Sequence, residues 1–169
     1  AAQVNLPLAY FYARDMPKAF EEGKKAVEAY PGKVNPLYNY VWYAIGAGRF
    51  DVAEAEIPKI MKLDPKFAEP HVCLALIRLS QGKADEAARE CRAIEAMGAY
   101  PAALASAGLA DIALFEGRWG DARKVLEAGI AADIAGGQKS MAVTAQGALA
   151  RTLLDLGEKK AALTTLESA

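Results

Sequence analysis

Histidine and cysteine are scarce in this chain of 169 residues, which has one histidine, His71, and two cysteines, Cys73 and Cys91. A single histidine excludes His-rich metal sites and argues against His-dependent catalysis. Two cysteines are too few for a disulfide scaffold or a structural zinc site. A charge excess is also missing, because 20 Lys and Arg stand against 21 Asp and Glu, for a net charge of -1. This balance argues against a protein that coats nucleic acid or an anionic membrane surface.

Long hydrophobic runs are absent as well. The longest stretch of small and apolar residues runs from Ala99 to Ala110, and the charged Asp111 ends it. Since a membrane-spanning helix needs about 20 predominantly apolar residues, insertion into a membrane is not expected. The opening segment AAQVNLPLAY has no basic region of the kind that begins a signal peptide. We therefore expect a soluble, cytoplasmic protein.

The sequence does contain a pattern that repeats at a nearly constant interval. Four glycines follow apolar segments, the first three almost evenly spaced and the fourth slightly further on: Gly48, Gly82, Gly117 and Gly157. An alanine stands five positions after each glycine, and a fifth alanine lies one interval before the first of these: Ala53, Ala87, Ala122, Ala162 and Ala19. Two independent markers thus share one period, which is the signature of a repeat architecture.

Within one period the apolar spacing predicts two helices, over residues 37–47 and 51–63. Gly48 is expected to end the first helix, because glycine adopts the left-handed conformation at a helix C-terminus at little cost. Pro58 lies inside the second segment, where a proline should kink the helix or shift its start.

These marks resemble the tetratricopeptide repeat (TPR) family. The residues that carry the resemblance are Tyr40, Val41, Gly48, Ala53, Ile60 and Pro65 in one unit, Leu74, Ala75, Gly82, Ala87 and Ile94 in the next, and then Leu109, Ala110, Gly117, Ala122 and Gly129, followed by Leu149, Ala150, Gly157 and Ala162. The resemblance implies an all-α fold, an α-α superhelix of about five helix-turn-helix units. The alternative is an unrelated helical bundle with accidental spacing.

The expected units form a single array that is a fragment of a longer protein. Their approximate bounds are 1–33, 34–67, 68–102, 103–142 and 143–169. The segment from Gly108 to Gly137 is also similar to arrays attached to bacterial signalling proteins such as serine/threonine kinases. The connection over residues 135–139 adds length, as a looser joint or as longer helices.

Departures from the family pattern occur in the second helix of each unit. The large aromatic residue usual there is replaced in turn by Gly23, Ile57, Cys91, Leu126 and Leu166. These replacements leave open how each unit fills the space that the aromatic ring would occupy.

No catalytic constellation emerges from the sequence. His71 and Cys73 are two residues apart on one expected helix, so their side chains diverge. Gly136 and Gly137 lack the lysine spacing of a phosphate-binding loop. We therefore expect no enzyme activity, no cofactor and no metal site.

The resemblance implies a binding surface instead, because the first helix of each TPR unit lines a concave groove. The groove candidates are Phe11, Tyr12, Tyr38, Trp42, Ile45, Val72, Leu76, Leu79, Asp111 and Arg151. Tyr38 and Trp42 are four residues apart on one helical face and are of the types that anchor bound peptides. The alternative for each candidate is packing between neighbouring units.

Some TPR domains hold acidic peptide tails with a clamp of Lys, Asn and Arg. The matching positions here are Val4, Tyr38, Val72, Ala107 and Gly147, and four residues further on Leu8, Trp42, Leu76, Asp111 and Arg151, with no asparagine among them. A charged clamp is therefore not expected. An apolar and aromatic groove suits an apolar peptide, an amphipathic helix or a neighbouring domain.

The leading hypothesis is a non-catalytic protein–protein interaction module. A second hypothesis is self-association as a homodimer through the last expected helix, residues 159–169, or a regulatory role within a larger bacterial signalling protein. A third is an enzyme of unknown type, which a bound cofactor or metal would favour.

Overall fold

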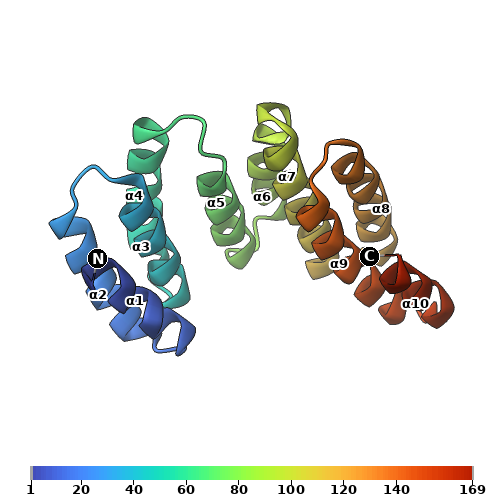
Figure 1. The fold of residues 1–169 in the computed structure, drawn as a ribbon, viewed down its shortest axis with the longest axis horizontal. Coiled ribbons are helices and arrows are strands. Elements are labelled where there is room, and N and C mark those ends of the chain that lie inside the picture. The colour runs from blue at the N-terminus through green and yellow to red at the C-terminus, as the bar shows by residue number, and fades with distance from the viewer. Residues whose placement is uncertain (1, 169) are drawn as a thin grey trace. The chain divides into compact units, whose positions relative to one another are not determined.

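The computed structural model describes the backbone of residues 2–168 and the side chains of residues 5–168. Within that part of the chain the regular secondary structure is helical, without strands (Figure 1). The α-helices are α1 (Ala2–Tyr12), α2 (Met16–Ala29), α3 (Val34–Gly46), α4 (Phe50–Leu63), α5 (Glu69–Ser80), α6 (Ala84–Ala93), α7 (Ala99–Phe115), α8 (Trp119–Ala135), α9 (Lys139–Asp155) and α10 (Lys159–Glu167), and a short 3-10 helix, η1 (Glu95–Met97), precedes α7. The fold class is all-α, as the sequence predicts.

The helices belong to two compact parts, residues 1–77 and 78–169. In the first part α2 packs against α1 and α3, α3 packs against α4, and α1 also touches α3. In the second part α7 packs against α6 and α8, α8 against α9, and α9 against α10, while α7 also touches α9. In each part the first helices of neighbouring pairs therefore come into contact. The single array over the whole chain stays a prediction.

The turn inside a helix pair requires a residue with positive φ. Gly48 follows α3 with φ of 71°, which glycine adopts without a clash because it has no Cβ. Arg14 occupies the place one period earlier, after α1, and has φ of 61°. The amide of Asp15 then donates to the carbonyl oxygen of Tyr10 at 2.9 Å, and a bond of 2.8 Å closes the turn at Gly48 in the same way. The first pair thus makes the repeat turn without a glycine.

The marker alanines of the repeat are all buried. Four of them are fully buried, and the fifth is 1% exposed: Ala19, Ala53, Ala87, Ala122 and Ala162. Because protein interiors are close-packed, a longer side chain at these positions would push the helices apart. The predicted register of the repeat is confirmed.

Gly23 is buried on α2, where the family usually carries a large aromatic residue. A Cβ at this position would lie 2.6 Å from Cδ2 of Tyr43 and 3.2 Å from Cδ2 of Tyr40. The two rings of α3 therefore fill the space, and the aromatic bulk comes from the facing helix. At the other departures the replacements Ile57, Cys91 and Leu126 are buried, whereas Leu166 is exposed.

The expectation that Pro58 shifts the start of its helix is wrong. α4 begins at Phe50 and runs through Pro58 to Leu63. The proline is exposed, so its missing N–H removes one hydrogen bond from the helix without opening a gap in the core.

The extra length near the end of the chain lies in the helices. α7, α8 and α9 have 17 residues each, and the last two pairs begin at Ala99 and Lys139, ahead of the expected residues 103 and 143. Of the two alternatives for the added length, longer helices are therefore the one observed. Even so, none of the described helices combines the length and the apolar character that crossing a bilayer demands.

Candidate peptide-binding groove

Four aromatic side chains proposed for a groove come from the first two helix pairs. Phe11 and Tyr12 end α1, while Tyr38 and Trp42 lie one turn apart on α3. Residues four apart on a helix face the same side, and the rings of Tyr38 and Trp42 meet edge to face with centroids 6.4 Å apart. Phe11 and Tyr12 make a similar edge contact at 5.8 Å.

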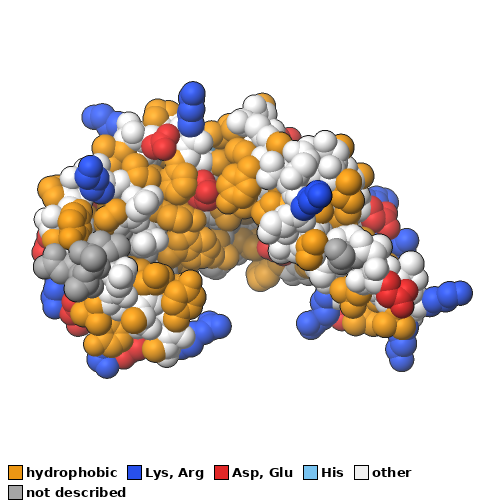
Figure 2. All heavy atoms as spheres, viewed as in Figure 1, with side chains coloured by type: hydrophobic (Ala, Val, Ile, Leu, Met, Phe, Trp, Pro, Cys, Tyr) orange, Lys and Arg blue, Asp and Glu red, His pale blue; other side chains and the backbone are white. Residues whose placement is uncertain are grey.

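α1 and α3 form the walls of a pocket of about 330 Å³. The residues that line it are Leu8, Phe11, Tyr12, Asn39, Trp42 and Tyr43, and none of them carries a charge. Tyr12 stands at the rim and is 75% exposed, whereas Phe11 and Trp42 are half-buried. Figure 2 shows hydrophobic side chains gathered over these helices. The volume reaches the lower end of the range for ligand pockets, about 300–1,000 Å³.

Tyr43 forms the inner wall of this pocket and is 2% exposed. Its ring packs against Phe11 with centroids 5.6 Å apart. The Tyr43 hydroxyl is buried and has no hydrogen-bond partner among the described residues. Burial, with a smaller contribution from the neighbouring Tyr12, raises the pKa of Tyr43, so the hydroxyl remains neutral. An unsatisfied buried hydroxyl costs about 1–3 kcal/mol.

Two of the proposed groove residues on α3 are engaged in packing. The ring of Tyr38 meets Phe67 edge to face at 4.9 Å, besides its contact with Trp42. Ile45 is half-buried against a core that includes Val41, Ile57 and Ile77. Tyr38 therefore supports Trp42 from the side, and it does not line the pocket itself.

The three candidates on α5 differ in exposure. Val72 and Leu79 are half-buried, and Leu76 is exposed. They are one or two turns apart along the helix, and whether they contact a partner stays a prediction.

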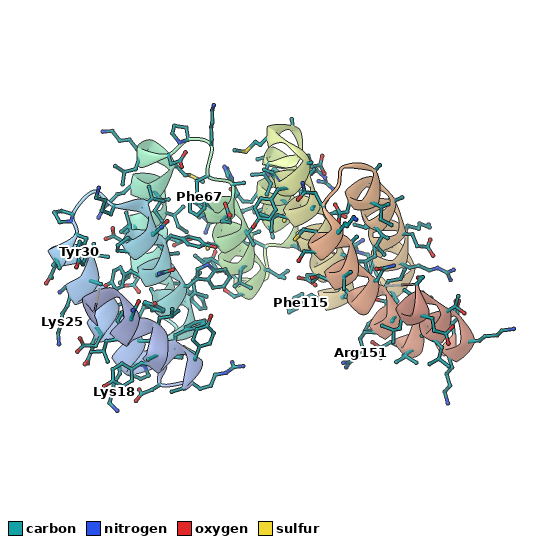
Figure 3. The ribbon with its side chains drawn as sticks, in the orientation of Figure 1. Lys18, Lys25, Tyr30, Phe67, Phe115 and Arg151 are labelled. Atoms are coloured by element: carbon teal, nitrogen blue, oxygen red, sulfur yellow. The ribbon has the colours of Figure 1, made fainter. Side chains whose placement is uncertain are left out.

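The two charged candidates lie in the second compact part. Asp111 is exposed on α7 and lines a separate, smaller pocket. Arg151 extends from α9 into solvent (Figure 3) and forms an ion pair with Asp155 at 3.6 Å. The structure thus gathers Phe11, Tyr12 and Trp42 in one pocket and places Asp111 in another.

Sequence reasoning did not single out three lining residues of the aromatic pocket. Leu8 was considered only as a clamp position, and Asn39 and Tyr43 were not candidates. The helical spacing indicates that Asn39 and Tyr43 share a face of the helix, because they are four residues apart. They follow Tyr38 and Trp42 by one residue each. The side chain of Val4, another clamp position, lies outside the described residues.

The cysteines offer little reactivity. Both are free and buried. Burial raises the pKa of Cys73 to about 12 and that of Cys91 to about 11. Since the thiolate is the reactive form, these side chains behave as small hydrophobic groups. Among the described residues, no three His, Cys, Asp or Glu side chains gather as a set of metal ligands.

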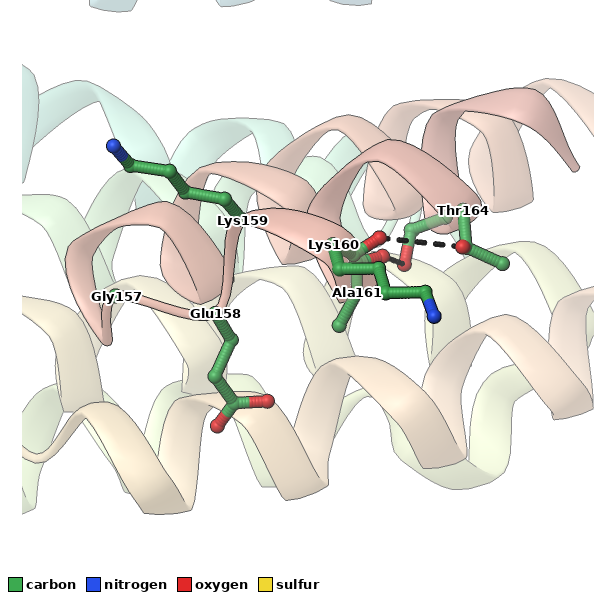
Figure 4. Close-up of a pocket in the computed structure, with 7 residues that line it drawn as sticks. Gly157, Glu158, Lys159, Lys160, Ala161 and Thr164 are labelled. Atoms are coloured by element: carbon green, nitrogen blue, oxygen red, sulfur yellow. Dashed lines mark hydrogen bonds between the residues drawn. The ribbon is translucent and has the colours of Figure 1, made fainter.

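A wider hollow of about 760 Å³ runs along α10 (Figure 4). Glu158, at its edge, forms an ion pair with Arg123 at 2.9 Å. The hydroxyls of Thr164 and Thr165 donate to carbonyl oxygens of their own helix, at 3.2 and 3.0 Å. The polar groups of Glu158, Thr164 and Thr165 are therefore already engaged.

Comparison with known proteins identifies the repeat. Residues 107–169 match the family model of the tetratricopeptide repeat. No curated protein matches the chain.

Several solved structures share the fold over almost the whole chain. A TPR protein from Parabacteroides merdae ATCC 43184 is 14% identical with a TM-score of 0.68, over 98% of this chain and 62% of that one. Pseudomonas aeruginosa pilF is 14% identical with a TM-score of 0.68, over 99% and 74%. MamA from Desulfovibrio magneticus RS-1 is 16% identical with a TM-score of 0.59, over 98% and 90%. This chain thus spans less than two thirds of the Parabacteroides protein. Residues 107–169 thus match the tetratricopeptide repeat, and nearly the whole chain shares the fold of solved TPR structures, as its sequence predicts.

Proposed function

We propose that this chain is a non-catalytic protein–protein interaction module, and that the pocket between α1 and α3 receives an apolar side chain of a bound peptide or amphipathic helix. The observation that supports the proposal is the pocket itself, an uncharged hollow of about 330 Å³ lined by four aromatic rings. The TPR fold supports the same class of function, since it presents helix surfaces to other polypeptides.

The side chains around the pocket suit this task. Trp42 and Tyr12 offer large, stiff surfaces, and Trp and Tyr are enriched among residues that dominate binding energies. Tyr43, which is 2% exposed, closes the inner side of the pocket. The preferred anchor is therefore an apolar side chain.

A peptide selection tests this proposal. Peptides are selected from a random library on the immobilised chain, and their Kd is measured for the wild type, for Trp42→Ala and for Trp119→Ala. Trp119, the other tryptophan, is partly exposed on α8 and serves as the matched control. Loss of a central aromatic anchor costs about 2 kcal/mol, which is roughly a 30-fold rise in Kd. The Tyr38→Ala, Trp42→Ala double variant is measured as well, and equal affinity of this variant and the wild type would show that the groove assignment is wrong.

Self-association is the second candidate function, and the surface of α10 favours it. Leu163 and Leu166 on this helix are 62% and 52% exposed, and exposed apolar side chains of this kind mark contact surfaces when they cluster. Light scattering over a range of concentrations separates the two functions, since a homodimer dissociates on dilution. A mass that stays monomeric at every concentration removes the second candidate.

A further inference from the structure

A second pocket lies within the second compact part, between α7, α8 and α9. Its volume is about 120 Å³, which is too small for a drug-sized ligand but fits a single side chain. Ala103 and Ala107 of α7 and Ala145 of α9 give it apolar walls, and two carboxylates, Asp111 and Asp133, line it as well. An acidic group among alanines is unexpected in a packed helical interface.

Asp133 is the unusual member of this lining. It is only 6% exposed, and its carboxylate has neither a hydrogen-bond nor an ion-pair partner among residues 5–168. Burial raises the pKa of Asp133, and partial desolvation raises that of Asp111. Buried carboxylates are normally paired, because removing the charge from water without compensation is costly.

The polar neighbours of Asp133 in the pocket are occupied elsewhere. The Ser106 hydroxyl donates to the carbonyl oxygen of Val125 at 3.3 Å. The Thr144 hydroxyl donates to the carbonyl oxygen of Ser140 at 3.0 Å. Since a hydroxyl has one hydrogen to donate, neither is available to the carboxylate. The carboxylate oxygens of Asp133 can therefore accept hydrogen bonds from a group that enters the pocket.

The size and the lining of the pocket limit what it can bind. Its lining residues on α7 run from Ala103 to Asp111, positions about 12 Å apart along an α-helix. Two carboxylates do not provide the set of six or more oxygens that calcium requires. A volume of about 120 Å³ with apolar walls and two carboxylates suits an unbranched chain with a positive end.

We propose that this pocket binds a lysine side chain of a partner polypeptide, with the methylene stem against the alanines and the ammonium group at Asp133. Asp111, at the exposed part of the lining, adds a second negative charge that favours entry of a cation. The stem of lysine packs readily on apolar surface while its head carries three donors. Arginine would bring a broader, planar head into the same small space. The inference rests on the proposed function only in that the lysine belongs to a protein partner.

The test uses n-butylammonium, which reproduces the lysine side chain, and therefore needs no partner. The full chain is titrated with it while amide signals of α7, α8 and α9 are followed by NMR. We expect saturable binding that weakens about tenfold or more in Asp133→Asn, since a hydrogen bond to a charged group is lost. The matched control is Asp121→Asn, an exposed position on the same helix that pairs with Arg118 at 3.0 Å, and it should bind as the wild type does.

Three results would overturn the assignment. One is binding of the neutral n-butanol as tightly as n-butylammonium. Another is undiminished binding of n-butylammonium by Asp133→Asn when the spectrum of that variant shows the native fold. The third is tighter binding of n-butylguanidinium, which would assign the pocket to arginine. None of these depends on Trp42, so failure here leaves the aromatic pocket to be judged by its own experiment.

Discussion

Arg14 holds a backbone conformation that the other repeat turns leave to glycine, and Arg14→Gly should stabilise the protein. Its φ of 61° lies in the left-handed region, which costs a residue with a Cβ about 1–2 kcal/mol. Glycine removes that cost but loses more entropy on folding, about 0.4–1 kcal/mol. Because Arg14 is exposed, few contacts are lost with its side chain. The net expectation is a gain of about 0.5–1 kcal/mol in the free energy of unfolding.

The measurement is urea unfolding followed by circular dichroism, with Gly48→Ala as the partner variant. No heavy atom lies within 4 Å of a Cβ built at Gly48, so the cost of that alanine is backbone strain alone, about 1 kcal/mol. The two substitutions thus probe equivalent turns in opposite directions. A decrease in stability for Arg14→Gly, or no change for Gly48→Ala, would refute the reasoning about these turns.

Other substitutions test the packing, the buried carboxylate and the thiols. Ala87→Leu should lower the free energy of unfolding by about 1–3 kcal/mol through overpacking, because Ala87 is fully buried; an unchanged thermal melt would contradict its place between the helices. Asp133→Asn should raise stability by about 1 kcal/mol at neutral pH. The raised pKa of Asp133 means that the folded state binds more protons between the unfolded and folded pKa values, so wild-type stability falls as pH rises through that window, and the gain disappears below it. Cys73 and Cys91 should react with a thiol reagent at neutral pH only as the chain unfolds, given pKa values of about 12 and about 11; fast reaction of the native protein would contradict their burial.

The repeat was predictable from sequence because its markers report local geometry. Gly48 marks a turn that needs positive φ, and Ala53 and Ala87 mark close approaches of two helices, so each residue type carries its own physical requirement. Helix bounds followed within a few residues, as for α3 and α4. Pro58 does not shift the start of α4, because an exposed proline can lie in a helix that tertiary packing holds in place.

The pockets were less predictable, because they depend on which neighbouring helices meet. The i,i+4 pair of Tyr38 and Trp42 was visible, but only the contact between α1 and α3 brings Trp42 to Phe11 and turns Tyr38 toward Phe67. Asp133 was missed for the same reason. Asp133 lies seven residues after the buried Leu126, which indicates that it shares the buried face of its helix. That its carboxylate has no partner among the described residues becomes visible only once α7, α8 and α9 are placed together.

Gly23 on α2 lies against the rings of Tyr40 and Tyr43, although it does not line the aromatic pocket itself. Tyr43 rests on Gly23 at one edge and forms the inner wall of the aromatic pocket. An added methyl group at Gly23 would displace that ring and reshape the pocket without altering any residue that a ligand touches. Ligand preference in such a module can therefore drift through a position hidden behind the recognition surface, where a comparison of pocket linings alone would overlook it.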